Sequence, residues 1–473
     1  MNLKNIIIIV LLITPCFSNN SPFAQGTDFS LYNIEQRNQI KSIVGPYQKL
    51  NKSTKLAYKS YLESYWDIAY TILSPSMYEK EKKVLNNKKP ISAKKRHIID
   101  QLYIYNAKKI ANLNNTKLIL KPVKKDPSIE CETLQLNYCN TYFSFDIPKK
   151  LKNIYLQLYD EESIANYWYK VPTKDVEYLI DQILYNCNKK RINDWGLIEI
   201  TNIISNMLFD DKNEQIFFSW LLFGYMNYDI KLGRWNHELY LLYHFNEIIF
   251  EKEYVVINGK PYYSISEPLP SAIETYYNDF NYEIFAFDLS FTESPLFNED
   301  LEKKNYNFIY NDKLINLDLH INKSLIEFFK NYPSCHIKIG LNSIISESLS
   351  DDLARDIIPI IKNMTDKEKI NFLLYLTNTI TGYKLDQFNF KKQKQLFPDE
   401  YLFYDYSDCE DKVIFFVALV RLLTDIPTIA TIYNNHIATA LQIRMVRGVN
   451  TNYLGLKYYL ADPSYPNTKV GFE

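Results

Sequence analysis

The sequence has little glycine and no surplus of charge of either sign. Its 473 residues include 11 glycines, and 54 Lys and Arg side chains stand against 55 Asp and Glu. A balanced chain offers no basic field for a phosphate backbone, so we expect no nucleic-acid partner. Beyond the first 24 residues no apolar run is long enough to cross a bilayer, so we expect no integral membrane segment in the mature chain.

Histidine and cysteine are scarce as well, with six of each. None of them cluster at the spacing of metal ligands, so we predict neither a metal site nor a cofactor. Loss of a leader containing Cys16 would leave five cysteines, an odd number that leaves one thiol over in an exported protein. If that thiol is Cys409, the other four allow up to two disulfides, with Cys131 and Cys139 the nearest pair. The alternative that none of these cysteines forms a disulfide is equally open.

The first residues predict a secretory signal peptide. Lys4 precedes an apolar run over residues 6–13, and Pro15 with small or polar residues follows it. The run is too short to span a membrane, so we assign residues 1–24 to a removed signal peptide. The mature chain would then be exported to the periplasm or the cell surface. Lipidation at Cys16 is an alternative.

Changes in hydrophobic period divide the remaining chain into helical and β-rich regions. Side chains at helical spacing, such as Tyr58, Leu62 and Ala69, predict an N-terminal helical region, and Asn258-Gly259 predicts a hairpin turn. The predicted fold class is α+β. The predicted regions are 25–115 (helical), 116–163 (small and β-rich, with strands at 117–121 and 142–146), 164–254 (helical, then β), 255–330 (β-rich) and 331–473 (a C-terminal domain).

One apolar helix begins at a cysteine. Ser407 followed by Glu410 is a capping-box pattern, which predicts Ser407 as the N-cap and places Cys409 in the first helical turn. Unpaired N–H groups and the helix dipole lower the pKa of a thiol at such a position. The neighbouring carboxylates of Asp408, Glu410 and Asp411 oppose a thiolate, so Cys409 needs a cationic partner.

Two partners for this cysteine follow along the chain. A strand is predicted at 426–433, and a second strand begins at His436 after an Asn-Asn turn. A third strand at 457–461 ends at Asp462. A thiol, an imidazole and a carboxylate in these places can meet at one sheet edge as nucleophile, base and orienting group.

The three motifs together resemble the transglutaminase-like superfamily, a papain-related α+β fold. They are Asp-Cys-Glu-Asp at 408–411, His-Ile-Ala-Thr-Ala at 436–440 and Ala-Asp-Pro-Ser-Tyr at 461–465. The resemblance extends over about 331–473 and is to exported bacterial members. It implies that Cys409 is the nucleophile, His436 the general base and acid, and Asp462 the residue that orients the imidazole.

Attack of this thiolate on an amide carbonyl would give a thioester acyl-enzyme. The expected oxyanion donor is the backbone N–H of Cys409, with Gln387 or Tyr406 as candidate side-chain donors. With water as acceptor the activity is that of a peptidase or amidase on peptides or cell-wall peptides; with an amine it is protein crosslinking. The competing class is a non-catalytic cell-envelope binding or scaffold protein with a vestigial triad. No oligomeric state is predicted.

A faint internal repeat links the middle region to the cysteine-bearing helix. Without gaps, residues 215–225 fall on 413–423, and the run that starts at Glu238 falls on the run that starts at His436. At this offset Asp211 falls on Cys409. We therefore hypothesise a second, degenerate transglutaminase-like module over about 164–254 that lacks thiol chemistry. Chance similarity of two apolar helix–strand units is the alternative.

Overall fold

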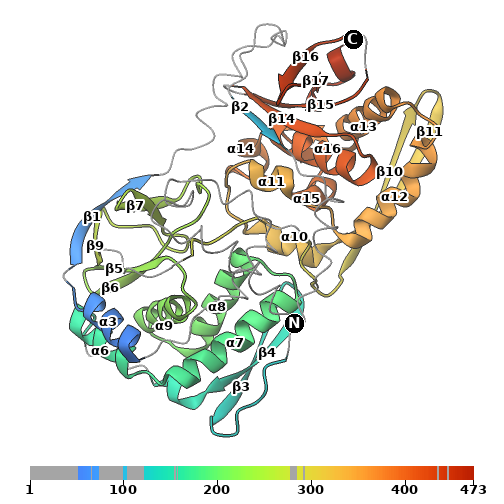
Figure 1. The fold of residues 1–473 in the computed structure, drawn as a ribbon. Helices are drawn as coiled ribbons and strands as arrows, with labels where there is room; N and C mark the ends of the chain where they lie inside the picture. Colours follow the sequence, from blue (N-terminus) through green and yellow to red (C-terminus); the bar gives the residue numbers. More distant parts are fainter. Residues whose placement is uncertain are drawn as a thin grey trace, which may run out of the picture. The chain divides into compact units, whose positions relative to one another are not determined.

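The fold is α+β, with helices and strands alternating in groups along the chain (Figure 1). A computed structural model describes residues 52–64, 66–73, 100–103, 122–153, 156, 158–276, 285–290, 293–433, 436–444 and 447–472. The expected signal peptide at 1–24 and the expected strand at 117–121 lie outside these residues. The expected strand at 142–146 is confirmed within β4 (Thr141–Pro148).

The first half of the described chain combines a hairpin, a group of helices and a closed barrel. After α3 (Lys52–Leu62), the hairpin and helices are β3 (Cys131–Tyr138), β4, η5 (Lys149–Lys152), α6 (Glu161–Lys170), α7 (Thr173–Lys189), α8 (Asp194–Leu208) and α9 (Lys212–Tyr225). The barrel consists, in order around it, of β1 (Trp66–Leu73), β7 (Glu253–Ile257), β8 (Lys260–Tyr263), β6 (Glu238–Tyr243), β5 (Ile230–Trp235) and β9 (Ala272–Tyr276).

The prediction of a helical N-terminal region is confirmed for α3 but is wrong for residues 66–73 and 100–103. Residues 66–73 form strand β1, which pairs with β7 and β9, and residues 100–103 form strand β2. Trp66 and Ala69 are buried in β1 while Ile68 is 55% exposed. Their spacing also fits one helix face, so the local pattern was ambiguous. Pairing with strands far along the chain decides the outcome, and local propensity does not reveal it.

The second half has a hairpin, a longer series of helices and an open antiparallel sheet. The hairpin and helices are β10 (Leu301–Tyr310), β11 (Lys313–Asn322), α10 (Lys323–Lys330), α11 (Lys338–Asn342), α12 (Glu347–Ile361), α13 (Asp366–Ile380), α14 (Asp386–Asn389), α15 (Pro398–Phe403) and α16 (Cys409–Leu423), with a short parallel pair β12 (Gly382–Tyr383) and β13 (Tyr406–Ser407). The sheet order is β16 (Asn450–Tyr453), β17 (Leu456–Ala461), β15 (His436–Leu441), β14 (Thr428–Tyr433) and β2 (Asp100–Tyr103), and η6 (Val470–Phe472) follows. The three strands expected around His436 are confirmed.

The two halves repeat one succession of elements. In each, a hairpin and several helices lead to an apolar helix, α9 or α16, which is followed by two hairpins. The strand order of these hairpins is β5-β6-β8-β7 in the first half and β14-β15-β17-β16 in the second. In the first hairpin the last paired residues before the turn are Trp235 and Glu238. In its counterpart they are Tyr433 and His436, each 198 positions later in the chain.

The second hairpin of each half also has the same geometry. The turn that joins β7 to β8 is Asn258-Gly259, with φ of 50° and 77°, as the sequence predicted. The turn that joins β16 to β17 is Leu454-Gly455, with φ of 49° and 78°. Two consecutive positive φ angles are typical of a type I′ turn. Because β7 and β8 belong to the barrel, the expected module boundary at residue 254 falls inside β7.

The halves differ in how their sheets end. β1 and β9 close the first sheet into a barrel, whereas the second sheet remains open, with β2 beside β14 at one edge. The apolar helices are central in both halves, since every residue from Asp411 to Arg421 in α16 is buried and so are Phe217 to Phe223 in α9. Among the described residues, no helix is both long and apolar enough to cross a membrane.

Candidate active site

His436 and Asp462 are in direct contact at one end of the open sheet. His436 is the first residue of β15, and Asp462 follows the last residue of β17, its neighbour in the sheet. His436 Nε2 lies 2.6 Å from Asp462 Oδ2. The other carboxylate oxygen, Oδ1, accepts hydrogen bonds from Ser464 N at 3.0 Å and Ser464 Oγ at 2.6 Å. Because Asp462 is 1% exposed and held on both oxygens, it fixes the orientation of the imidazole.

The aromatic rings of Tyr433 and Tyr465 lie next to the imidazole ring of His436. The ring centroid of His436 is 6.3 Å from that of Tyr433 and 5.6 Å from that of Tyr465. Since Nε2 is engaged by Asp462, Nδ1 is the ring nitrogen available to exchange a proton with a thiol.

Cys409 is the first residue of α16, and Asp408 is its N-cap. The Asp408 carboxylate accepts two backbone N–H groups of the first turn, and the Asp411 carboxylate accepts Asp408 N at 3.1 Å, which completes a capping box. The prediction that Ser407 is the N-cap is wrong by one residue. Ser407 belongs to β13, and its Oγ lies 2.6 Å from Thr381 Oγ1, so its side chain is already engaged.

Helix α16 packs against the strand that begins at His436. One apolar cluster contains Val413 of α16 and Ile437 of β15, together with residues of α11 and β14. Val413 lies one helical turn beyond Cys409 and on the same side of the helix. Ile437 directly follows His436. Cys409 and His436 are therefore the first residues of two elements, α16 and β15, that pack against each other.

The two candidate oxyanion side chains are both accessible to solvent. Gln387 lies exposed in α14. Tyr406 lies in β13 and is 46% exposed, and Lys384 Nζ is 5.1 Å from its ring centroid. The oxyanion role of either side chain stays a prediction.

Three buried carboxylates meet at the start of α16. One oxygen from each of Asp386, Asp408 and Asp411 lies within 4.8 Å of the others, and none of these residues is more than 3% exposed. Burial, together with the charges of Asp408 and Asp411, raises the pKa of Asp386 to about 11, and burial raises the pKa of Asp411 to about 6. Burial and the neighbouring charges therefore favour the protonated form of Asp386. The sequence does not reveal the place of Asp386 in this cluster, because only the fold brings it back to the start of α16.

These carboxylates are the one group with metal-ligand spacing in the described part of the chain. Oxygen ligands of this kind suit a hard cation such as Ca²⁺ or Mg²⁺. However, Asp411 already accepts Leu396 N at 2.8 Å and Asp408 N at 3.1 Å, and Asp386 Oδ2 accepts Lys394 N at 2.8 Å. A proton on Asp386 also relieves the charge repulsion among the three carboxylates, so no metal ion is needed to offset it. The absence of a metal site stays a prediction.

A buried lysine lies in the same helical turn. Lys412 is 2% exposed, and its Nζ donates to Thr381 O at 3.1 Å. Burial lowers the pKa of Lys412 to about 8, although Asp411 and Asp408 oppose this shift. Because the hydrogen bond directs the ammonium to Thr381, His436 is the better candidate for the cationic partner that Cys409 requires.

None of the five cysteines among the described residues is disulfide-bonded, so the structure has no Cys131–Cys139 bridge. Cys187 and Cys335 are buried, and burial raises the pKa of both thiols. Burial likewise raises the pKa of Cys139 to about 12. A raised pKa makes these thiols poor nucleophiles. Cys409 is partly exposed, as Cys139 is, and it differs from these three thiols in being the first residue of a helix.

Comparison with protein-family models, with curated proteins and with solved structures finds no match. The roles of Cys409, His436 and Asp462 are therefore argued from the sequence motifs and from the geometry of this one chain.

Proposed function

We propose that this protein is an exported, cysteine-dependent amide hydrolase of transglutaminase-like type. Cys409 is its nucleophile, His436 its general base and acid, and Asp462 the positioning residue. The observation that carries the proposal is the 2.6 Å contact between His436 Nε2 and Asp462 Oδ2, at the end of the sheet on which the cysteine-bearing helix packs. A buried carboxylate that holds an imidazole is the base part of the arrangement that thiol acyl transfer needs, and Cys409, at the start of the helix packed on that sheet, supplies the thiol.

The reaction begins with transfer of the thiol proton from Cys409 to His436. The thiolate then attacks the carbonyl carbon of the amide, and the resulting oxyanion accepts the Cys409 backbone N–H. Collapse of this intermediate breaks the C–N bond, and the leaving amine takes the proton from His436. Water, deprotonated by the same imidazole, attacks the thioester and releases the acid and the free thiol. Peptides or cell-wall peptides are the proposed substrates, and an amine acceptor would give crosslinking instead.

A second candidate function is binding without catalysis, and the acidic cluster favours it. Asp408 and Asp411 are buried beside the thiol, and negative charge near a cysteine raises the free energy of its thiolate. In this alternative the triad is vestigial and the protein acts in the cell envelope as a binding or scaffold component.

The alkylation rate of Cys409 as a function of pH separates the two candidates. For the hydrolase we expect iodoacetamide to label Cys409 quickly at about pH 6, because a thiolate–imidazolium pair persists well below the usual thiol pKa of about 8.5. His436→Ala should abolish this fast labelling. His320→Ala is the matched control, since His320 Nδ1 also contacts a carboxylate, Asp352 Oδ2 at 2.9 Å, away from Cys409 in sequence.

The hydrolase would be ruled out if the pH dependence of labelling gave Cys409 an ordinary thiol pKa and if His436→Ala did not change it. That outcome would favour the binding protein. Cys409→Ala gives the background from the partly exposed Cys131 and Cys139, which must be subtracted at each pH.

A further inference from the structure

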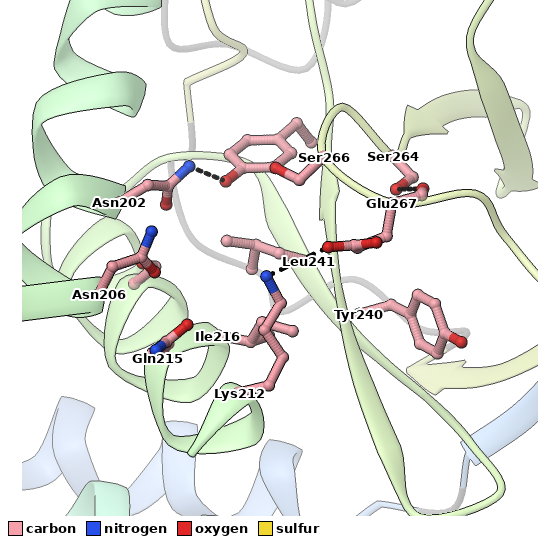
Figure 2. Close-up of a pocket in the computed structure, with 12 residues that line it drawn as sticks. Asn202, Asn206, Lys212, Gln215, Ile216, Tyr240, Leu241, Ser264, Ser266 and Glu267 are labelled. Carbon is pink, nitrogen blue, oxygen red and sulfur yellow. Dashed lines mark hydrogen bonds and ion pairs between the residues drawn. The ribbon is translucent and has the colours of Figure 1, made fainter. Parts of the chain in front are cut away.

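The barrel of the first half offers a partner no free strand edge, because its described strands close into a ring. The pocket beside β6 has a volume of about 70 Å³, far below the range of about 300–1,000 Å³ that is typical of ligand sites. Figure 2 shows an ion pair in this pocket, in which Lys212 Nζ lies 3.2 Å from Glu267 Oε1. Among the described strands the longest are β10 and β11, and they form a sheet of two strands with two outer edges.

Helix α12 covers the outer edge of β11. Asp318 N donates to Asp356 Oδ2 at 2.9 Å, and His320 N donates to Asp352 Oδ2 at 2.8 Å. Arg355 donates to the carbonyl oxygen of Asp318 at 2.6 Å. The backbone groups of Asp318 and His320 therefore point toward α12 and away from β10, and no further strand can pair with them.

The outer edge of β10 has no such cover among the described residues. The β11 residues that face α12 pair with Asn305 and Lys303. Because residues that pair without hydrogen bonds direct their backbone groups away from each other, those of Asn305 and Lys303 point outward, and so do those of Asn307 and Ile309. In the described part of the chain only the hydroxyl of Tyr375 reaches this row, where it donates to Ile309 O at 2.7 Å. The edge between its ends is open to another strand.

A second copy of β10 fits this edge. If two copies run antiparallel about Asn305, Lys303 of one copy lies opposite Asn307 of the other, and Leu301 lies opposite Ile309. Each outward backbone group then meets an outward group of the other copy, so the strands can hydrogen-bond in pairs. A register about Lys303 would instead place two lysines opposite each other, which is unfavourable. The favoured register is self-complementary, as a twofold interface requires.

The same register brings exposed apolar side chains together. Leu301, Ile309 and Leu314 are 44%, 64% and 65% exposed. Ile309 pairs with Leu314 across the hairpin, so both side chains lie on one face. In the proposed register Leu301 of the other copy extends this pair into a row of three. Neighbouring apolar side chains on one face of a sheet stabilise it, so the row favours a second copy over an unrelated polar strand.

The two lysines of β10 do not close the edge. Charged side chains on an edge strand often prevent pairing with another chain. However, Lys303 Nζ lies 3.6 Å from Asp318 Oδ2 of β11, and Lys304 Nζ donates to Phe403 O at 2.6 Å. Both ammonium groups are thus directed to other parts of the same chain.

From these observations we propose that the protein forms a symmetric dimer in which β10 pairs with β10 of a second copy, with Asn305 at the twofold axis. The two hairpins then form one sheet of four strands. Because the contact is confined to one strand, it is smaller than a standard interface, and we expect a Kd on the order of 10 μM. The inference does not depend on the proposed activity of Cys409.

Sedimentation of the mature chain at about 1–100 μM tests the dimer, and we expect the mass to rise from monomer to dimer across this range. Asn305→Pro should weaken the dimer about tenfold or more, because proline lacks the N–H yet is tolerated on an edge strand. Asn316→Pro, at an exposed residue on the opposite edge of the hairpin, is the matched control and should dimerise as the unmodified protein does. A chain that stays monomeric, or equal dimerisation by Asn305→Pro, would overturn the proposal and leave the edge to another partner.

Cysteine crosslinking tests the register without a proline. Residues that share hydrogen bonds across an antiparallel ladder have Cα atoms about 5.5 Å apart, within the reach of a disulfide. Asn305→Cys should therefore form a disulfide-linked dimer by itself. Lys303→Cys and Asn307→Cys should do so only when the two are mixed, because each lies about 14 Å along the strand from its own counterpart. The unmodified protein gives the background from the native thiols. A dimer that crosslinks at none of these positions would place the contact elsewhere and refute the proposal.

Discussion

Glu199, a partly buried carboxyl group of α8, couples ionisation to folding. Burial raises the pKa of Glu199 to about 7, the hydrogen bond from Tyr138 lowers it, and the charge of Glu327 raises it. The unfolded chain releases the same proton near pH 4.3. Between these two values the folded protein holds a proton that the unfolded chain has lost, so the folded state loses stability as the pH rises from about 4.3 to about 7.

Glu199→Gln should remove this pH dependence. We expect the free energy of unfolding of the unmodified protein to fall by on the order of 2 kcal/mol across that window, and that of the variant to fall by less, because glutamine does not titrate. Urea unfolding at several pH values measures both. Glu327→Gln should lessen the same fall, because the charge of Glu327 raises the pKa of Glu199. Equal slopes for unmodified protein and Glu199→Gln would contradict the prediction.

At the scale of elements, the two type I′ turns provide a reciprocal experiment. Asn258 and Leu454 occupy the same turn position with φ near 50°, where asparagine is favoured and leucine is strained. Leu454 is 84% exposed, so its side chain has little packing to lose. Leu454→Asn should therefore raise the free energy of unfolding by about 1 kcal/mol, and Asn258→Leu should lower it by a similar amount. Denaturant midpoints of the two variants provide the test. A loss of stability in Leu454→Asn would show that the turn is not under strain.

The sequence was most informative where a feature is local to an element. The turn at Asn258-Gly259, the start of β15 at His436 and the start of the apolar helix near Cys409 follow from residue types within a few positions. Capping was misplaced by one residue because Ser407 and Asp408 are both good N-cap residues, and burial of Ser407 against Thr381 decides between them.

Features that depend on distant segments were not predicted. The assignment of β1 as a strand requires β7 and β9, and the carboxylate cluster requires Asp386 to return to the start of α16. The sequence predicted that Asp462 lies beside His436, because His436 begins one strand and Asp462 directly follows the end of another.

At the scale of the whole molecule, the two N-terminal strands serve different sheets. β1 completes the barrel of the first half, whereas β2 pairs with β14 in the second half, between Tyr103 and Ile429 among other pairs. Each of these pairings joins residues widely separated in sequence, and such contacts form slowly because chain closure is costly in entropy.

Pulsed hydrogen exchange during refolding should resolve this order. Amides of the local hairpins β5–β6 and β14–β15 should gain protection first, since their turns contain two residues each. Amides of β1 and β2 should gain protection last. Protection of β2 before that of β14 and β15 would contradict this order, because β14 is its partner in the sheet.

The place of β2 has a consequence for synthesis. A ribosome makes residues 100–103 early and their partners at 429–432 near the end of the chain. During most of translation β2 therefore has no strand to pair with, while the barrel can close once residue 276 has emerged. We infer that the nascent chain carries an unpaired strand, a risk for aggregation, until its last tenth is being made. A chain cut short before β14 would keep this strand exposed permanently.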